Sequence, residues 1–225
     1  MKRTRIGIAV LAAATLGCSL GSIPSQLAGE TNAGGEVQAP EEARALFEDD
    51  FSDSGSGWDI VEDKTEYADG EYRIFVGESS YDYWANPGRH FGGDVRIDVD
   101  ARKAGGPDDN NFGIQCRYNQ DDGFDYYSLQ ISSDGYVWIA RVDDGDATGI
   151  SSEQMEPSEF VLQGDATNHL TAYCSGDQIT LWVNGENVAS ATDSTYADGD
   201  VGLIAGTYET AGADIRFDNF TVTAD

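Results

Sequence analysis

The sequence predicts an all-β protein built as an antiparallel sandwich or barrel. From Leu46 onward, short runs alternate apolar and polar residues, as in Glu71–Val76 (EYRIFV), and no run shows the period of an amphipathic helix. Asp-Gly and Asn-Gly pairs separate the runs, for example at Asp69, Asp134 and Asn184. Such pairs favour the positive φ angles of tight turns. Short strands at this spacing indicate one antiparallel β domain over residues 46–225.

The clearest hairpin covers residues 126–141 (YYSLQISSDGYVWIAR), with Asp134-Gly135 at its turn. Alternation places Tyr127, Leu129 and Ile131 on one face, and we expect that face to join a hydrophobic core. Rings and polar groups occupy the opposite face, which is either plain surface or a binding surface. Its members are Tyr126, Ser128, Gln130, Tyr136 and Trp138.

Four more segments alternate in the same way and are expected to be strands or hairpins. They are residues 94–103 (DVRIDVDARK), 178–190 (QITLWVNGENVAS), 199–207 (GDVGLIAGT) and 213–224 (ADIRFDNFTVTA).

The N-terminus has the sequence pattern of an export signal. A basic start (MKRTR) precedes a short apolar run that ends in TLGC, and the run is too short to span a bilayer comfortably. Small residues just before Cys18 resemble a bacterial lipobox, which implies cleavage of residues 1–17 and attachment of lipid to Cys18. An ordinary secretory signal is the alternative. Residues 18–45 are small and polar without a sustained period, which is typical of a flexible tether.

Acidic residues dominate the composition, with 41 Asp and Glu against 13 Lys and Arg and a net charge of −28. Nucleic acids are therefore not expected as partners, because phosphates need a basic surface. Three interpretations of the acidity remain open: solubility outside the cell, adaptation to high salt, and cation binding by some carboxylates.

Two cysteines fall in the β region, and both lie on apolar strand faces. Cys116 alternates with Phe112 and Ile114, and Cys174 with Leu170 and Ala172. Outside the cytoplasm, core-facing cysteines on different strands tend to pair, so we expect a Cys116–Cys174 disulfide. Two free buried thiols are the alternative.

The order of these segments resembles a concanavalin A-like sandwich (jelly roll), and more narrowly the laminin G-like domains of bacterial surface lipoproteins. The most specific parts are the LWVNG hairpin, the DVGLIA strand after it and the closing FDNFTV. The resemblance implies two curved sheets of six or seven strands, with one concave face. It also implies that the first strand, near 47–51, lies beside the last, near 215–222.

Glycosidases of this fold carry E-x-D-x-x-E, because retaining hydrolysis needs two close carboxyl groups. That motif is absent here, and EDDFSD at residues 48–53 is the nearest approach. If RIDVDA takes the place of the catalytic strand, Arg96 and Ala101 stand where glutamates would be. A catalytic role therefore remains an alternative without assigned residues.

A structural calcium ion is a further expectation from the resemblance, since related sandwiches bridge their first and last strands in this way. The matching carboxylates are Asp49 or Asp50 and Asp218. Hard cations prefer such oxygen ligands.

Sugar-binding sandwiches stack exposed rings on pyranose faces and bind hydroxyls with nearby polar groups. The alternative is that the aromatic rings on this face are structural and pack under loops or against the other sheet. The candidate ligand-binding residues on the face away from the core are Arg96, Asp98, Gln115, Arg117, Tyr126, Gln130 and Trp138, and the segment ESSYDYWANPGRHF adds Tyr83 and Trp84 beside Tyr81. Arg117 and Asp98 are expected either to pair with each other or to contact a ligand.

The sequence thus favours a lipid-anchored, extracytoplasmic, lectin-like binding module without catalysis, with carbohydrate as the leading ligand. A structural or protein-interaction domain of the cell envelope is the second hypothesis, and a glycoside-directed enzyme is the third.

Overall fold

The computed structural model describes residues 45–119 and 124–224 of the 225-residue chain. Within that part of the chain there is no helix that could cross a membrane. The expected signal peptide (1–17), the lipidation site Cys18 and the tether up to residue 44 lie outside the described residues, so these stay predictions. Ala45, the last residue of the expected tether, begins the first strand.

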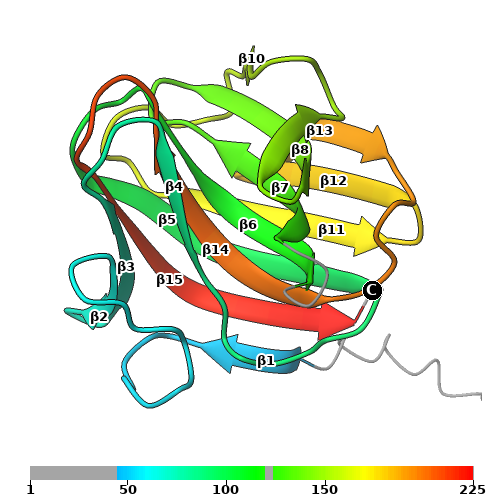
Figure 1. Ribbon diagram of the computed structural model, residues 1–225, viewed down its shortest axis with the longest axis horizontal. Coiled ribbons are helices and arrows are strands. Elements are labelled where there is room, and N and C mark those ends of the chain that lie inside the picture. The colour runs from blue at the N-terminus through cyan, green and yellow to red at the C-terminus, as the bar shows by residue number, and fades with distance from the viewer. Residues whose placement is uncertain (1–44, 120–123, 225) are drawn as a thin grey trace, which may run out of the picture. The chain divides into compact units, whose positions relative to one another are not determined.

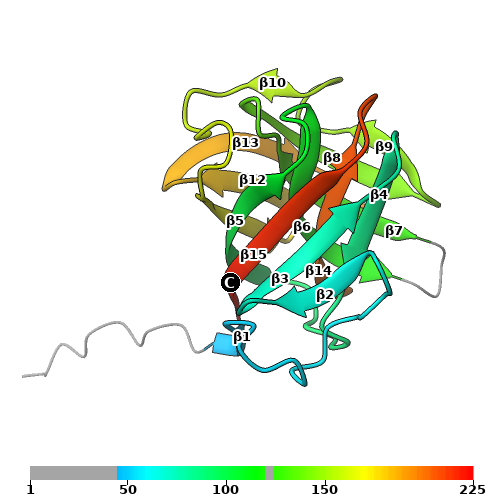
Figure 2. The ribbon, with the colours of Figure 1, turned by 90° about the vertical axis from the view of Figure 1, so that its left-hand side faces the viewer.

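The described residues form two stacked antiparallel sheets, which confirms the predicted sandwich. Sheet 1 has the order β13-β12-β11-β5-β15-β3-β2, with β1 paired to β15. Sheet 2 has the order β10-β8-β7-β6-β14-β4, with β9 paired to β8. Figure 2 shows the two layers, with β12, β13, β5 and β15 on the left and β4, β7 and β9 on the right.

The strands of sheet 1 are β1 (Ala45–Asp49), β2 (Thr65–Ala68), β3 (Glu71–Val76), β5 (Val95–Gly105), β11 (Asn168–Ser175), β12 (Gln178–Val183), β13 (Glu186–Thr192) and β15 (Ala213–Ala224). Those of sheet 2 are β4 (Tyr81–Ala85), β6 (Asn110–Asn119), β7 (Asp125–Ile131), β8 (Tyr136–Asp143), β9 (Asp146–Gly149), β10 (Glu156–Pro157) and β14 (Asp200–Thr207). Sheet 1 has eight strands and sheet 2 has seven, so sheet 1 exceeds the expected six or seven.

The first and last strands lie side by side, as expected. In β1, Phe47 pairs with Val222 and Asp49 with Phe220 of β15 (Figure 1). This pairing joins segments from opposite ends of the domain.

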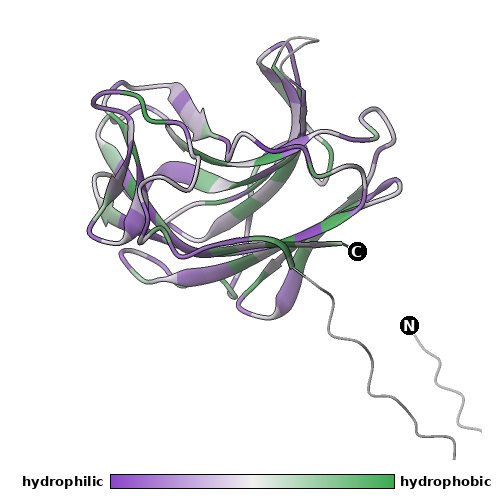
Figure 3. Ribbon diagram, turned by 90° about the horizontal axis from the view of Figure 1, so that it is seen from below, coloured by the Kyte–Doolittle hydropathy of each residue, from purple (hydrophilic) through white to green (hydrophobic). Residues whose placement is uncertain are grey.

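The hydrophobic core fills the space between the sheets, because each strand turns one apolar face inward. Ile97 and Val99 of β5 and Ile114 of β6 are fully buried, and Leu129 of β7 packs in the same cluster. Figure 3 shows hydrophobic and hydrophilic residues alternating along the ribbons. Burial of this kind is the main stabilising contribution to a β-sandwich.

A disulfide between Cys116 and Cys174 crosses the core, as predicted. Cys116 lies on β6 of sheet 2 and Cys174 on β11 of sheet 1, with their Cα atoms 6.7 Å apart. The bond therefore ties one sheet to the other.

The Asn184-Gly185 turn joins β12 and β13 as its sequence indicates. Both residues adopt positive φ, 53° and 88°, which is the conformation of a two-residue hairpin turn.

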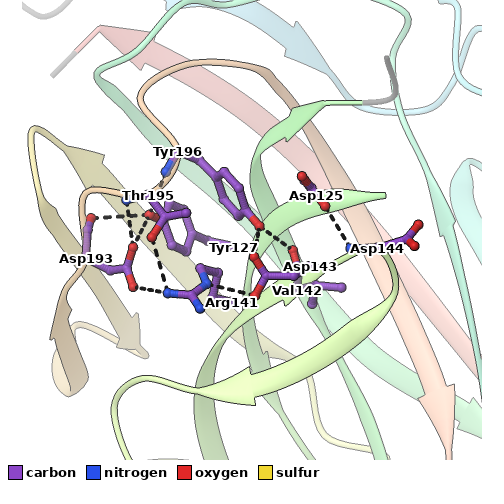
Figure 4. A network of polar contacts seen from close by, with 9 residues as sticks. All are labelled: Asp125, Tyr127, Arg141, Val142, Asp143, Asp144, Asp193, Thr195 and Tyr196. Carbon is purple, nitrogen blue, oxygen red and sulfur yellow. Dashed lines mark hydrogen bonds and ion pairs between the residues drawn. The ribbon is translucent and has the colours of Figure 1, made fainter. Parts of the chain in front are cut away.

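A polar network at one end of the sandwich holds the segment after β13 against sheet 2 (Figure 4). Asp193 accepts hydrogen bonds from the Tyr127 hydroxyl at 2.7 Å and from the Thr195 amide at 2.8 Å. Its other oxygen pairs with Arg141 at 2.9 Å. The Tyr196 hydroxyl donates to the carbonyl of Val142 at 2.9 Å.

Because of this network, we expect the free energy of unfolding to depend on pH in the acidic range. Burial alone would raise the pKa of Asp193, but hydrogen bonds from Thr195, Tyr127 and Arg141 outweigh burial and lower it to about 2. A carboxyl with a lowered folded-state pKa adds stability above its unfolded pKa, and this stability is lost as pH falls through the folded value.

We therefore expect Asp193→Asn to lose on the order of 2 kcal/mol of unfolding free energy at neutral pH. The difference from wild type should shrink between about pH 4 and pH 2, as wild-type Asp193 becomes protonated. Denaturant titrations across that range would measure it. A difference that stays constant down to pH 2 would show that Asp193 does not titrate in this way.

Candidate functional site

The outer face of sheet 2, which points away from the core, is unusually buried for a surface. Gln115 is 0%, Ser128 2% and Gln130 4% exposed, although all three alternate with core residues. Tyr126 of the same face packs with Tyr118, Val142 and other apolar residues in a second hydrophobic cluster, separate from the core. The face is therefore hollowed and partly filled by its own rings.

A cavity of about 310 Å³ opens on this face, and we call it the hollow. It spans β4, β14, β6, β7 and β8, and reaches the β8–β9 hairpin at Gly145. Its lining includes Tyr81, Asp82, Asn111, Tyr126, Ser128, Gln130, Trp138, Thr207 and Tyr208.

One polar group without a hydrogen-bond partner among the described residues lines the hollow. The Ser128 hydroxyl is buried and has no hydrogen-bond partner among the described residues. Gln130, two residues along the same strand, lines the hollow beside it. Buried polar groups are nearly always hydrogen-bonded in native proteins, so an orphan at a cavity is suited to a ligand.

Aromatic rings form the walls of the hollow. Trp138 is fixed by its indole N–H, which donates to the carbonyl of Ser152 at 3.1 Å. Tyr81 of β4 and Tyr208, which follows β14, line the hollow across the same face from Trp138 and are 52% and 37% exposed. Rings arranged around a few polar groups are typical of ligand sites.

Asp82 supplies a carboxylate at the rim of the hollow. The side chain is open to solvent on one side, but protein surrounds it elsewhere, and this desolvation raises the pKa of its carboxyl. A hydrogen bond from Asn111, at 3.0 Å, acts in the opposite direction without cancelling the effect.

Gly206 of β14 makes room for this pair. A Cβ at this position would lie 1.6 Å from an Asp82 oxygen and 2.4 Å from the Asn111 side-chain oxygen. Only glycine therefore lets both side chains cross the strand at this point.

Gln115 lies under the rings of the second cluster, and neither end of its amide has a hydrogen-bond partner among the described residues. Burial raises the pKa of Tyr126, while the Gln115 amide lowers it, so the two groups are near each other. They do not meet hydrogen-bond geometry, however. An orphan buried amide destabilises a fold by about 1–3 kcal/mol.

We expect Gln115→Leu to raise the free energy of unfolding by about 1 kcal/mol, because it removes this unpaired amide. Asn110→Leu on the same strand is the control. Asn110 is buried, but its amide is fully used by Pro107 and Ser133, so its replacement should destabilise the protein. Chemical unfolding would compare the two, and a loss of stability in both variants would contradict the expectation.

The structure distributes the predicted site residues over several separate regions. Tyr126, Gln130 and Trp138 lie around the hollow as the alternation of the 126–141 hairpin suggested, and Gln115 lies beneath the rings. Whether these residues bind a ligand stays a prediction.

Arg96 and Asp98 do not share this face, so that part of the prediction is wrong. Both lie on β5 of sheet 1, where Arg96 pairs with Asp98 through two contacts of 2.8 Å. Burial alone would raise the pKa of Asp98, but hydrogen bonds from Arg96 and Thr171 lower it overall. The sequence could not show which sheet this strand joins.

Arg117 also lies elsewhere and does not pair with Asp98. The pairing of β6 with β7 is interrupted after Cys116, and Arg117 adopts a positive φ of 55°. This bulge breaks the alternation. The guanidinium, 1% exposed, donates to the carbonyls of Gly176 and Tyr196, both at 2.8 Å.

Tyr83 and Trp84 lie near the free edge of sheet 2, where they line an edge cavity of about 430 Å³ that does not share these residues with the hollow. The Tyr83 ring contacts the Lys64 ammonium, 4.2 Å from its centroid, and Trp84 packs against Phe124. Neither residue lines the hollow, although Tyr83 contacts the Tyr81 ring and Trp84 packs against the second hydrophobic cluster.

Asp50 and Asp218, the expected calcium ligands, lie near the pairing of β1 with β15. Asp50 accepts hydrogen bonds from Ser52, and Asp49 turns inward to Phe51 and Trp58. Burial and nearby carboxylates, including Asp50, raise the pKa of Asp218. Among the described residues no three His, Cys, Asp or Glu side chains gather as a metal site, and calcium stays a prediction of the sequence.

Three residues that line the hollow, Asp82, Asn111 and Tyr208, are not among the binding residues that the sequence predicts. Asp82 sits among the rings of YDYW, which were selected because they are aromatic, so the carboxylate between them was passed over. Asn111 lies on β6 and Tyr208 directly follows β14, and no local pattern reveals where these two strands lie across the sheet.

The architecture and the hollow together define a concanavalin A-like sandwich. Similar solved structures include the carbohydrate-binding module CBM66 of Bacillus subtilis (TM-score 0.60, 19% identity, covering 75% of this chain and 96% of that one). A β-glucanase of Bacillus licheniformis has a TM-score of 0.57 at 13% identity, with coverage of 80% and 98%. A lichenase derived from a mouse hindgut metagenome has a TM-score of 0.56 at 14% identity, covering 80% and 99%. At these identities the similarity shows the fold alone.

Residues 42–223 match the family described as the 3-keto-alpha-glucoside-1,2-lyase-like domain, and the chain belongs to that family. No curated protein matches the chain.

Proposed function

We propose that the hollow on sheet 2 binds a sugar unit of a glycan without a covalent step. The observation that carries this proposal is the buried, unpartnered Ser128 hydroxyl at the cavity, beside Gln130 and the fixed ring of Trp138. Sugar hydroxyls would satisfy the polar groups, and a pyranose face would stack on a ring.

The comparisons support this proposal at the level of the fold. CBM66 is by its name a carbohydrate-binding module, and the β-glucanase and lichenase are by their names enzymes directed at glucans. Their low identity means that the residues of the hollow, and not the relatives, must carry the assignment to this chain.

Binding of neutral oligosaccharides to the purified protein, measured by calorimetry after a glycan-array survey, tests the proposal. We expect Gln130→Leu to weaken binding at least tenfold, since a buried polar contact to a ligand is worth about 1.5 kcal/mol or more. Gln178→Leu is the matched control, because Gln178 is an exposed glutamine on β12 of the other sheet.

Equal affinity of the Gln130→Leu and Gln178→Leu variants would show that the hollow is not the binding site. Failure of the wild-type protein to bind any neutral glycan would overturn the proposal and favour a protein partner of the envelope.

A second candidate function is a lyase, and the position of Asp82 favours it. The family description names a 3-keto-alpha-glucoside-1,2-lyase-like domain. A carboxylate with a raised pKa at the rim of a cavity is suited to act as a general base. Asp82 would take the proton from carbon 2 of a 3-keto-glucoside. The bond from carbon 1 to the glycosidic oxygen would then break, and that oxygen would gain a proton from water.

Release of the alcohol from an aryl 3-keto-α-glucoside tests this second candidate. Wild-type protein should release it, with a rate that rises as Asp82 loses its proton, and Asp82→Asn should lose the reaction. Binding of the same compound by Asp82→Asn would show that the loss is chemical. Absence of release by the wild type would exclude the lyase.

We further propose that the domain is exported and attached to a membrane by lipid on Cys18, which would expose the hollow to glycans outside the cytoplasm. The basic start, the apolar run and the TLGC sequence support this. We expect Cys18→Ala to move the protein from the membrane fraction to the soluble fraction after export. Retention in the membrane fraction would contradict the lipid anchor.

A further inference from the structure

A second cavity of about 500 Å³ adjoins the hollow. Tyr208 lines both cavities, so they meet at its ring. Tyr136 of β8 and Met155 complete the less polar part of the second cavity. Burial raises the pKa of Tyr208 to about 12, with further contributions from Asp82, Asp109 and Asp134. Carboxylates of both cavities therefore act on the same hydroxyl.

The charge of the second cavity is wholly negative. Asp109, Asp134 and Glu209 line it, and no lysine, arginine or histidine does among the described residues. None of these carboxylates forms an ion pair with a described residue, whereas many other carboxylates of the domain pair with arginine or lysine. Two tyrosine rings face the same space, with Tyr136 38% and Tyr208 37% exposed.

We propose that the two cavities form one cleft with adjoining subsites, and that the second subsite takes a sugar carrying a protonated amine. This inference rests on the proposed sugar binding by the hollow. The ligand class is a glycan with free amino sugars, such as an oligomer of glucosamine.

The chemistry of the cleft separates this ligand from the alternatives. An ammonium group is attracted by unpaired carboxylates and by the faces of aromatic rings. A uronic acid or a sulfated sugar would place like charges together, and none of the described residues that line the cleft is basic and able to offset the repulsion. The buried orphan hydroxyl of Ser128 then holds the neighbouring sugar, so the acidic lining is not the only feature that indicates a ligand.

Calorimetry with three oligosaccharides of equal length tests the inference: glucosamine, N-acetylglucosamine and galacturonic acid oligomers. We expect the glucosamine oligomer to bind roughly tenfold more tightly than the acetylated one at low salt, and the galacturonic acid oligomer not to bind. The advantage of the free amine should decrease at high salt, because the second cavity is open to solvent.

A triple variant, Asp109→Asn, Asp134→Asn and Glu209→Gln, should lose the tenfold advantage and keep its affinity for the acetylated oligomer. The matched control is Asp63→Asn, Asp69→Asn and Glu186→Gln, which changes the charge equally at exposed positions outside both cavities. The control should keep the advantage.

The outcomes distinguish this inference from the proposed function. Equal binding of the acetylated and free-amine oligomers would overturn the amine subsite and leave sugar binding intact. Equal loss in both triple variants would show that net charge alone attracts the amine, and would also overturn it. If no oligomer binds, the proposed function fails together with the inference.

Discussion

Replacing Cys116 and Cys174 together by alanine is expected to lower the free energy of unfolding by about 4 kcal/mol. The disulfide closes a loop between positions 58 residues apart and ties sheet 2 to sheet 1 through the core. In the chain-entropy model, a cross-link over such a loop stabilises mainly by restricting the unfolded chain. Denaturant unfolding monitored by tryptophan fluorescence would measure the change.

The double variant isolates the cross-link, because neither cysteine is left as an unpaired buried thiol. Tryptophan and tyrosine signals should report one cooperative transition in both proteins. A loss of less than 1 kcal/mol would show that residual structure in the unfolded chain already restricts it.

Replacing Arg117 by methionine is expected to destabilise the domain by about 3 kcal/mol. The guanidinium is almost fully buried and serves the carbonyls of Gly93, Gly176 and Tyr196 from three separate segments. Methionine fills similar volume but leaves these carbonyls without their donor. Because Asp94, its ion-pair partner, is 54% exposed, most of the loss should come from the carbonyls and not from an isolated buried charge.

Arg102→Met on sheet 1 is the control for this second result. Arg102 pairs with Glu71 at 2.6 Å, but its side chain is 36% exposed, so its replacement should change the unfolding free energy by less than about 1 kcal/mol. Thermal or chemical unfolding of the two variants would measure both losses in free energy of unfolding. Equal losses would show that the buried Arg117 contributes no more to stability than the exposed Arg102.

Much of the fold followed from local patterns. The bounds of the predicted segments 71–76 and 213–224 coincide with those of β3 and β15. Alternation holds throughout β3, but in β15 a bulge near Asn219 shifts the buried side by one residue. The disulfide could be predicted because Cys116 and Cys174 each shared a face with core residues in a chain expected to leave the cytoplasm. These inferences need only the side of a strand, which period two supplies.

The candidate site could be predicted only in part, because its assembly depends on which strands become neighbours. Tyr126, Gln130 and Trp138 belong to one hairpin, so alternation within that hairpin could predict their common face. Arg96 alternated correctly within β5, but that strand pairs with β11 and β15 in the other sheet. Arg117 failed for a different reason: the bulge after Cys116 changes the side to which the chain points, and no turn signal marks it.

The orphan amide of Gln115 has a consequence for how such a domain changes over generations. Natural proteins are held above a stability threshold and not at their most stable sequence, so a buried group that weakens the fold can persist while the rest of the domain tolerates it. Homologues that no longer bind a ligand on this face can acquire apolar side chains at positions 115 and 128, and we expect their domains to be more stable. Family members that retain polar side chains at both places would then mark the branches in which the original task continues.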